Sequence, residues 1–344
     1  MSEHTALLEL DDVTIEFGDV GPHGDGTVAV DRVSLAIDES PPRILNVAGE
    51  SGSGKTTAAR ALLGLQRPTA GRALWRGRDI YALDKRGLTA FRREVQVVFQ
   101  DPYGIFNPYY KIDRVFNMAI NSFGLASSRA EHKDLVEEAL RAVNLRPPDV
   151  LGRYPHQLSG GERQRVMLAR AYLLRPKVII ADEAISMLDV AVRATIMNIL
   201  LDFKEQHGVS TLFITHDLSA AYYLGGEIII MARGRIVEEG NVTTVLQRPA
   251  HPYSQLLLQS IPSPDPDRRW DAMPPPRSVP LDRLASRDRC LFAERCPHVS
   301  ELCLAARPPL RPAGEQLAAC VLYRAGAAQT AGDACTPSDR TVTR

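Results

Sequence analysis

The chain has 344 residues, 44% of them hydrophobic, so it can bury a full core and has room for one large domain with an appendage. Its 41 Lys and Arg residues balance 41 Asp and Glu residues, which argues against a nucleic-acid binder, because such a protein needs a basic excess to neutralise phosphates. No run approaches the roughly 18 to 20 apolar residues of a membrane-spanning helix, and residues 1–10 lack a signal-peptide pattern. We therefore expect the chain to stay in the cytoplasm.

Between residues 7 and 240, short apolar runs alternate with glycine turns and helix-length segments, which predicts an α/β domain. A helix is expected over residues 55–65, and a mostly helical, amphipathic insert over residues 113–174. Residues 228–231 and 235–239 flank Gly234 and predict a hairpin. The expected strands cover residues 7–17, 28–37, 43–48, 95–99, 177–181, 211–215 and 227–231.

Residues 49–56 read Gly-Glu-Ser-Gly-Ser-Gly-Lys-Thr, the P-loop pattern, and lie between an expected strand and an expected helix. In such a loop the backbone N–H groups and the helix N-terminus face phosphates, the lysine reaches the β- and γ-phosphates, and the threonine ligates Mg²⁺. The alternative is an ordinary Gly/Ser turn. The nucleotide-binding residues predicted here are Gly49, Ser51, Gly52, Ser53, Gly54, Lys55, Thr56 and Thr57.

Two carboxylates, Asp182 and Glu183, end the apolar run of residues 178–181. Carboxylates at the end of a buried strand are costly unless they have a role. Asp182 is predicted to hold Mg²⁺ through water, and Glu183 to polarise the attacking water as a general base. The alternative is a strand that ends at a solvated acidic turn.

Residues 158–165 read Leu-Ser-Gly-Gly-Glu-Arg-Gln-Arg, which resembles the signature sequence of ABC ATPases; the likeness extends over about residues 7–260. It implies a P-loop NTPase core of the α/β class with an antiparallel β subdomain and a helical subdomain at about 110–175. In that family Ser159, Gly160 and Gly161 contact the γ-phosphate of ATP held by a second subunit. A helix N-terminus suits an anion, although the same residues could simply cap a helix.

Three further residues fall in the order that ABC ATPases show. Gln100 resembles the Q-loop residue that touches Mg²⁺ or the attacking water, Asp189 the D-loop residue that faces the other subunit, and His216 the switch histidine that contacts the γ-phosphate. Each has an ordinary alternative as a polar residue at a strand end, a helix cap or a loop. Phe17 is a weaker candidate for the aromatic that stacks on adenine, because strand aromatics more often pack in a core.

The sequence departs from the family at Ala184 and Met187, where proline and a small residue are usual. The two carboxylates before them are kept. Loss of the proline is expected to loosen the turn after Glu183, which affects the hydrolysis rate more than nucleotide binding.

Beyond residue 260 the composition changes. Seven prolines between residues 261 and 280 predict a linker at 261–288, residues 289–323 hold four cysteines, and residues 324–344 form a polar tail. Four thiols in about thirty residues favour a metal site in a segment too short and too rich in Pro and Arg to build a core alone. The arrangement resembles the C-terminal extension of oligopeptide/dipeptide-type importers, which implies a [4Fe–4S] cluster on Cys290, Cys296, Cys303 and Cys320.

Zinc and four free thiols remain alternatives to the cluster, and Cys335, in the polar tail, is expected to have no role. The resemblance as a whole implies an ATP- and Mg²⁺-dependent motor subunit of an importer, peripheral on the cytoplasmic face of the membrane. Its implied partners are a second ABC ATPase subunit, two permeases and an external solute-binding protein. A non-transport ABC protein and a catalytically weak heterodimer subunit are the competing functions, and residues 106–111 leave peptide and oligosaccharide open as solutes.

Overall fold

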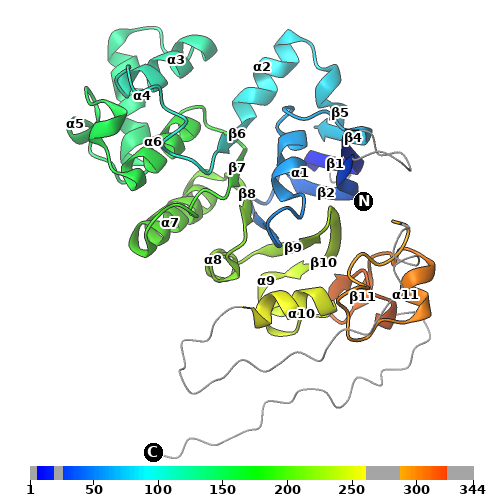
Figure 1. Ribbon diagram of the computed structural model, residues 1–344. Helices are drawn as coiled ribbons and strands as arrows, with labels where there is room; N and C mark the ends of the chain where they lie inside the picture. The colour runs from blue at the N-terminus through cyan, green and yellow to red at the C-terminus, as the bar shows by residue number, and fades with distance from the viewer. Residues whose placement is uncertain (1–5, 19–25, 261–286, 324–344) are drawn as a thin grey trace, which may run out of the picture.

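The computed structural model describes residues 6–18, 26–260 and 287–323 (Figure 1). Most of the expected linker, the polar tail and Cys335 lie outside these ranges. None of the helices described is long and apolar enough to cross a membrane.

The largest sheet has eight strands in the order β11-β12-β10-β9-β3-β8-β7-β6. The five strands from β9 to β6 in this order pair in parallel, and their apolar residues are buried on both faces, as a sheet covered by helices on two sides requires. The residues predicted for nucleotide chemistry follow the carboxyl ends of these strands, the edge at which open α/β sheets bind ligands. The five strands are β3 (Ile44–Ala48), β6 (Val95–Val98), β7 (Val178–Asp182), β8 (Ser210–Thr215) and β9 (Glu227–Ala232).

A second, antiparallel sheet has the order β2-β1-β4-β5, with β1 (Ala6–Phe17), β2 (Thr27–Asp38), β4 (Ala70–Trp75) and β5 (Arg78–Asp79). Helix α1 (Lys55–Leu62) shares one buried cluster with both sheets, because Leu62 packs in the same core as Leu10 and Leu45. The implied antiparallel subdomain is therefore present. The sequence patterns had not indicated β4, which opens with three exposed residues, or β5, which has only two residues.

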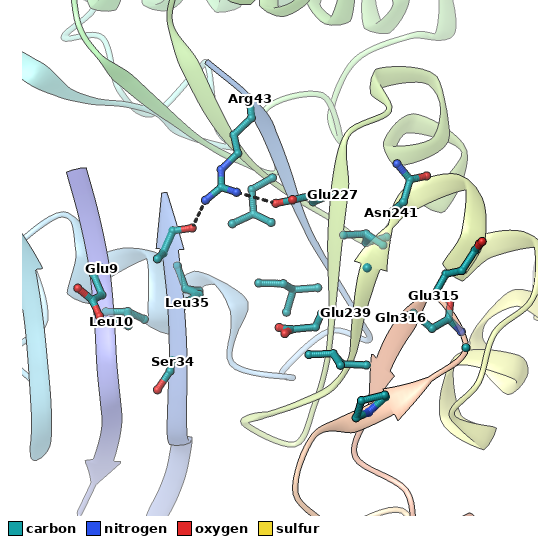
Figure 2. A pocket seen from close by; sticks show the side chains of 18 residues that line it. Glu9, Leu10, Ser34, Leu35, Arg43, Glu227, Glu239, Asn241, Glu315 and Gln316 are labelled. Atoms are coloured by element: carbon teal, nitrogen blue, oxygen red, sulfur yellow. Dashed lines mark hydrogen bonds and ion pairs between the residues drawn. The ribbon is translucent and has the colours of Figure 1, made fainter. Parts of the chain in front are cut away.

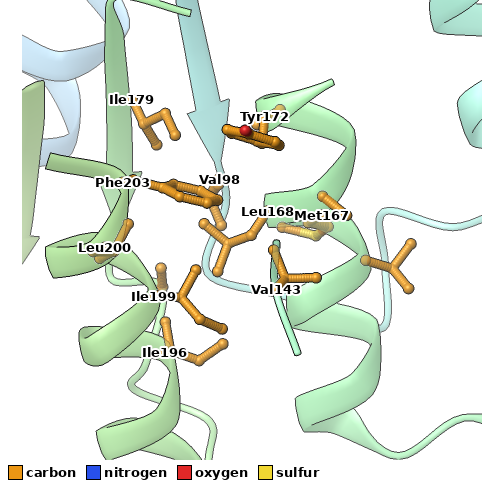
Figure 3. Close-up of a cluster of buried hydrophobic side chains, with 14 of the residues drawn as sticks. Val98, Val143, Met167, Leu168, Tyr172, Ile179, Ile196, Ile199, Leu200 and Phe203 are labelled. Carbon is orange, nitrogen blue, oxygen red and sulfur yellow. The ribbon is translucent and has the colours of Figure 1, made fainter. Parts of the chain in front are cut away.

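The region of the expected helical insert contains α3 (Asp113–Phe123), α4 (Arg129–Arg141), α5 (Pro147–Val150) and α6 (Gly160–Tyr172). Its core is continuous with α7 (Val190–His207), where the Tyr172 and Phe203 rings stack with centroids 4.8 Å apart (Figure 3). In Figure 1 this group lies on the far side of β6, β7 and β8 from α1. The remaining helices are α2 (Lys85–Glu94), α8 (Leu218–Leu224), α9 (Val242–Gln247), α10 (Pro252–Gln259) and α11 (Glu301–Ala305).

The cysteine segment, residues 287–323, is not a separate appendage. Its strand β12 (Gln316–Ala318) pairs with β10 (Arg235–Asn241) of the predicted hairpin, and β11 (Arg311–Ala313) pairs with β12 at the sheet edge. Phe292 and Cys303 share a buried cluster with Ile230 and Tyr253. The segment therefore builds no core alone, as expected, but is stabilised by the core of the α/β domain.

A buried carboxylate ties this segment to both sheets. The Asp31 carboxylate, on β2, lies 2.7 Å from an Arg235 nitrogen on β10 and 3.1 Å from Arg307, with Arg287 at 3.5 Å. Arg235 also donates to the carbonyl of Arg289 at 2.7 Å. Burial alone would raise the pKa of Asp31, but these guanidinium groups outweigh it and lower the pKa below its ordinary value of 3.8.

We predict that Asp31→Asn lowers the free energy of unfolding by about 3 kcal/mol, because it removes the carboxylate partner of the buried Arg235 and the half-buried Arg307. Chemical denaturation measures this loss. The folded pKa is depressed, so the contribution is complete above about pH 3.8 and disappears as pH falls through the folded pKa. The matched control Asp11→Asn breaks an exposed pair with Arg72 and should cost less than about 1 kcal/mol. Equal losses in the two variants would contradict this account.

Candidate active site

The loop of residues 49–54 connects β3 to α1 and is confined by neighbouring backbone. A Cβ on Gly49, whose φ is +151°, would lie 2.2 Å from the carbonyl oxygen of Met231. A Cβ on Gly54, whose φ is +99°, would lie 2.3 Å from the carbonyl oxygen of Ala29. Only glycine fits these two positions, so the glycines of the P-loop pattern are required by space as well as by conformation.

Lys55 opens α1 and is 4% exposed. Its ammonium donates to the carbonyl oxygens of Gly49 and Glu50, each at 2.8 Å, and to the Ser53 hydroxyl at 3.4 Å. Burial lowers the pKa of Lys55, while the charges of Glu183 and Asp182 oppose that shift. A buried ammonium held by neutral acceptors at the mouth of a glycine loop fits a phosphate ligand.

The Thr56 hydroxyl donates to a carboxylate oxygen of Asp182 at 2.9 Å. Burial raises the pKa of Asp182, an effect that this hydrogen bond opposes. A hydroxyl and a carboxylate side by side next to a phosphate-binding loop offer the oxygen ligands that Mg²⁺ prefers. The residues predicted to hold the cation are therefore adjacent.

Three side chains from different strand ends converge beyond Asp182. The Gln100 amide donates to Glu183 Oε2 at 3.0 Å, and His216 Nδ1 lies 3.6 Å from the same oxygen. Glu183 has a left-handed backbone, with φ of +47°, and its N–H donates to the carbonyl of Ile214. This arrangement fixes a carboxylate at the sheet edge with a neutral amide and an imidazole beside it, which suits a general base for a water molecule.

The turn after Glu183 is closed without proline. The N–H and the hydroxyl of Ser186 both donate to the Glu183 carbonyl, at 3.1 Å and 3.0 Å. Arg193, which the motifs did not indicate, donates to the carbonyls of Ser186 and Leu188 and so holds the next residues in place. The effect of Ala184 on the hydrolysis rate stays a prediction.

The signature loop, residues 159–161, opens α6 with a reciprocal cap. The Ser159 hydroxyl accepts from the N–H of Glu162, whose carboxylate accepts from the N–H of Ser159 at 2.8 Å. A Cβ on Gly161 would lie 2.5 Å from the side chain of Val192, so α7 approaches the loop closely. Ser159 therefore does cap α6, as the alternative reading of this loop expected. Its contact with ATP held by a second subunit stays a prediction.

Tyr103, which follows the Q-loop, is a residue that sequence reasoning missed. Its hydroxyl would lie 2.7 Å from a Cβ on Gly160, and the guanidinium of Arg163 lies 4.5 Å from its ring centroid. The region after Gln100 therefore packs directly on the signature loop. No short motif indicates such a contact.

Within the described part of the chain, two predicted residues, Phe17 and Asp189, form no hydrogen bond or ion pair with Gln100, Glu183 or His216. Phe17, at the end of β1 opposite Thr27, is 45% exposed rather than in the core, which leaves its ring free for stacking. Asp189 caps α7 by accepting from the N–H of Val192 at 2.9 Å, and Val190 beside it is 81% exposed.

The four predicted cysteines are free thiols around one small cavity, which His251 and His298 also line. Burial raises the pKa of Cys296 to about 11 and that of Cys320 to about 12. Among the described residues, however, no group of three or more His, Cys, Asp or Glu side chains is arranged to hold a metal ion. The metal site expected from the sequence is therefore not supported by this arrangement.

A cavity of about 740 Å³ lies between the two sheets, at the end opposite the phosphate loop (Figure 2). Arg43, just before β3, and Glu227, at the start of β9, are paired at 3.0 Å at its rim. Because these residues mark the amino ends of the parallel strands, the cavity is distinct from the nucleotide site.

Comparison with known proteins gives a consistent result. Residues 30–186 match the family described as ABC transporter, and residues 237–303 match the C-terminal region of oligopeptide/dipeptide transporters. The chain is 39% identical to a probable peptide ABC transporter ATP-binding protein of Sinorhizobium fredii, over 94% of this chain and 91% of the relative. It is 33% identical to an oligopeptide transport ATP-binding protein of Salmonella typhimurium, over 92% and 98%.

Solved structures agree on the fold. A dimeric ATP-binding cassette in a post-hydrolysis state with bound ADP and phosphate matches with a TM-score of 0.59 and 29% identity, over 68% of this chain and 98% of that one. A dimeric bacterial ABC transporter cassette matches with the same TM-score and 28% identity.

We predict that Glu183→Gln keeps ATP binding but lowers turnover by at least about a hundredfold, because the amide keeps the shape and loses the basicity. Steady-state phosphate release and equilibrium ATP binding measure the two effects. Lys55→Ala should instead weaken binding itself, since it removes the charge that offsets the phosphates. The half-buried Glu137 of α4, which pairs with Lys133 and Arg141 on that helix, provides a matched control in Glu137→Gln, with unchanged turnover. Undiminished hydrolysis in Glu183→Gln would refute the general-base assignment.

Proposed function

Because the chain belongs to the oligopeptide/dipeptide-type family of ABC transporter ATP-binding proteins, we propose that it is the motor of a peptide importer. The observation that carries the proposal is the strand edge at which Lys55, Thr56 and Asp182 lie beside Gln100 and Glu183. The relatives described above are peptide and oligopeptide transport proteins, which favours peptides over oligosaccharides.

Bound ATP would supply the phosphoryl group, and bound Mg²⁺ would offset the negative charge of the phosphates. Lys55 would bind the phosphates with its ammonium, and Thr56 would hold the cation through its hydroxyl and Asp182 through water. Glu183 accepts a proton from the attacking water, while the Gln100 amide fixes the orientation of the carboxylate. His216, whose Nδ1 lies 3.6 Å from Glu183 Oε2, would contact the γ-phosphate.

The active unit in this proposal is a dimer. Helix α6, which the signature loop opens, lies on the other side of β6, β7 and β8 from α1 within one chain, so a nucleotide held between both helix starts needs a second cassette (Figure 1). Met187 is 54% exposed and Val190 81% exposed next to Asp189, which favours an apolar contact with a partner there. The similarity to dimeric cassettes supports this arrangement. We propose a homologous but different subunit as the partner.

A groove beyond the Q-loop is the proposed docking surface for the permeases. It is lined by Tyr109, Tyr110 and Met118, of which Tyr109 is 85% exposed and Met118 56% exposed. Large exposed apolar and aromatic side chains next to one another mark interaction surfaces. Tyr103, which precedes this groove in the chain, packs on the signature loop, so permease movement and nucleotide state would be coupled through residues 103–109. The chain would then sit at the cytoplasmic face of the membrane and receive solute through an external binding protein.

The [4Fe–4S] cluster on the four cysteines is also a proposal. In its favour, Cys290, Cys296, Cys303 and Cys320 line one cavity, and four thiolates are the ligand set of such a cluster. The thiols would have to move closer and lose their protons when the cluster binds.

The transport proposal predicts that cells carrying the complete transporter take up a radiolabelled peptide, and that Glu183→Gln in this chain abolishes the uptake. A radiolabelled oligosaccharide of similar size should not accumulate. Glu137→Gln, the matched surface variant, should leave peptide uptake unchanged. Uptake that is equal in wild-type and Glu183→Gln cells would contradict a motor role, and oligosaccharide uptake alone would overturn the assignment of the solute.

For the cysteine segment we predict about four irons and four sulfides per chain after purification without oxygen. Replacing any one of the four cysteines with serine should remove the brown absorbance, because the cluster needs all four thiolates. Cys335→Ser is the matched control and should retain it. One zinc per chain, or no metal at all, would overturn the cluster and leave the motor assignment untouched.

A further inference from the structure

Two side chains from beyond residue 250 contact the second residue of the phosphate loop. The hydroxyl oxygen of Tyr253, in α10, accepts a hydrogen bond from the Glu50 N–H at 3.0 Å. Arg295, in the cysteine segment, pairs with the Glu50 carboxylate at 3.3 Å. These contacts bring the end of the chain, distant in sequence, onto the nucleotide site.

The hydrogen bond from Glu50 belongs to the peptide unit that also holds the P-loop lysine. The N–H of this unit donates to Tyr253, and its carbonyl oxygen, that of Gly49, accepts from the Lys55 ammonium at 2.8 Å. Hydrogen bonds on the two ends of one peptide group polarise and strengthen one another. Burial raises the pKa of Tyr253, so its hydroxyl stays neutral and available as the acceptor.

The cysteine segment supports both contacts through Phe292. The ring of Phe292 meets the Tyr253 ring edge to face, with centroids 5.6 Å apart, and the Arg295 guanidinium lies 5.8 Å from the Phe292 centroid. Phe292 and Arg295 lie between Cys290 and Cys296 in the sequence. Together with Ser51 and Gly52, these side chains line one small pocket against the outer face of the loop.

We propose that Tyr253 and Arg295 are positioning residues of the nucleotide site, through which the cysteine segment holds the phosphate loop and Lys55 in the form that binds ATP. This proposal rests on the proposed ATP-binding function, and it adds that the cysteine segment helps to set the affinity for ATP. Neither residue touches the nucleotide. Tyr253 acts through the Gly49–Glu50 peptide, and Arg295 acts through the Glu50 side chain.

The test uses the full chain and measures equilibrium ATP affinity, KM and kcat. Tyr253→Phe keeps the ring packing but removes the acceptor, so it should weaken ATP affinity about fivefold, the effect of one lost hydrogen bond. The KM should rise while kcat at saturating ATP stays within about twofold. Tyr323→Phe is the matched control, because that hydroxyl donates to the Ala250 carbonyl in the same region without touching the loop.

A double-mutant cycle tests the ion pair. Arg295→Gln and Glu50→Gln should each weaken ATP affinity about two- to threefold, and the double variant should be no weaker than either single variant. Arg295→Lys should restore most of the affinity. Arg248→Gln, which breaks the exposed pair with Glu315, is the control and should have no effect.

Unchanged ATP affinity in Tyr253→Phe and in Arg295→Gln would overturn the inference. If thermal unfolding shows that Tyr253→Phe does not fold, the double-mutant cycle of Arg295 and Glu50 still tests the inference. Additive losses in that cycle would equally refute the coupling through Glu50. Failure of the proposed function is distinguishable, because wild-type protein would then bind ATP no better than Lys55→Ala.

Discussion

The buried ammonium of Lys55 is the constraint on which the arrangement of the site depends. Its charge lies at the junction of β3 and α1 and is held by the carbonyl oxygens of Gly49 and Glu50. A buried cation is costly unless it has partners, so the loop must keep these carbonyls turned inward. The close approach of Gly49 to the Met231 carbonyl keeps the loop against β9 and thus fixes that geometry.

The two sheets and the helical region each position a different part of the site. The parallel strands bring Asp182, Glu183 and His216 to the edge where Lys55 lies, and the antiparallel sheet covers α1 from the other side. The helical region carries the signature loop at the start of α6, on the other side of β6, β7 and β8 from α1 (Figure 1). The Asp31 cluster fixes the cysteine segment to the same framework, since Arg235 and Arg307 reach it from two different elements.

Local patterns predicted most of the fold and most of the site. The parallel strands, the P-loop helix and the helical insert each have their own apolar periodicity, and each site residue follows a strand or opens a helix. The sequence did not indicate β4, β5, β11 and β12. Strand β4 opens with three exposed residues, the other three strands have only two or three residues each, and β11 contains Pro312 at a sheet edge. Tyr103, Arg193, Tyr253 and Arg295 were missed as site residues because their roles depend on tertiary contacts, up to 245 residues apart in the case of Arg295 and Glu50.

Hydrogen exchange with and without ATP and Mg²⁺ tests most directly where the nucleotide binds. The account predicts slower exchange in residues 49–57 and around Gln100 and Glu183 when both are added, with no change around the cavity that Arg43 and Glu227 line at the opposite sheet end. The Lys55→Ala variant should show no protection at the same ATP concentration. Protection confined to the opposite cavity, or equal protection in Lys55→Ala, would contradict the account.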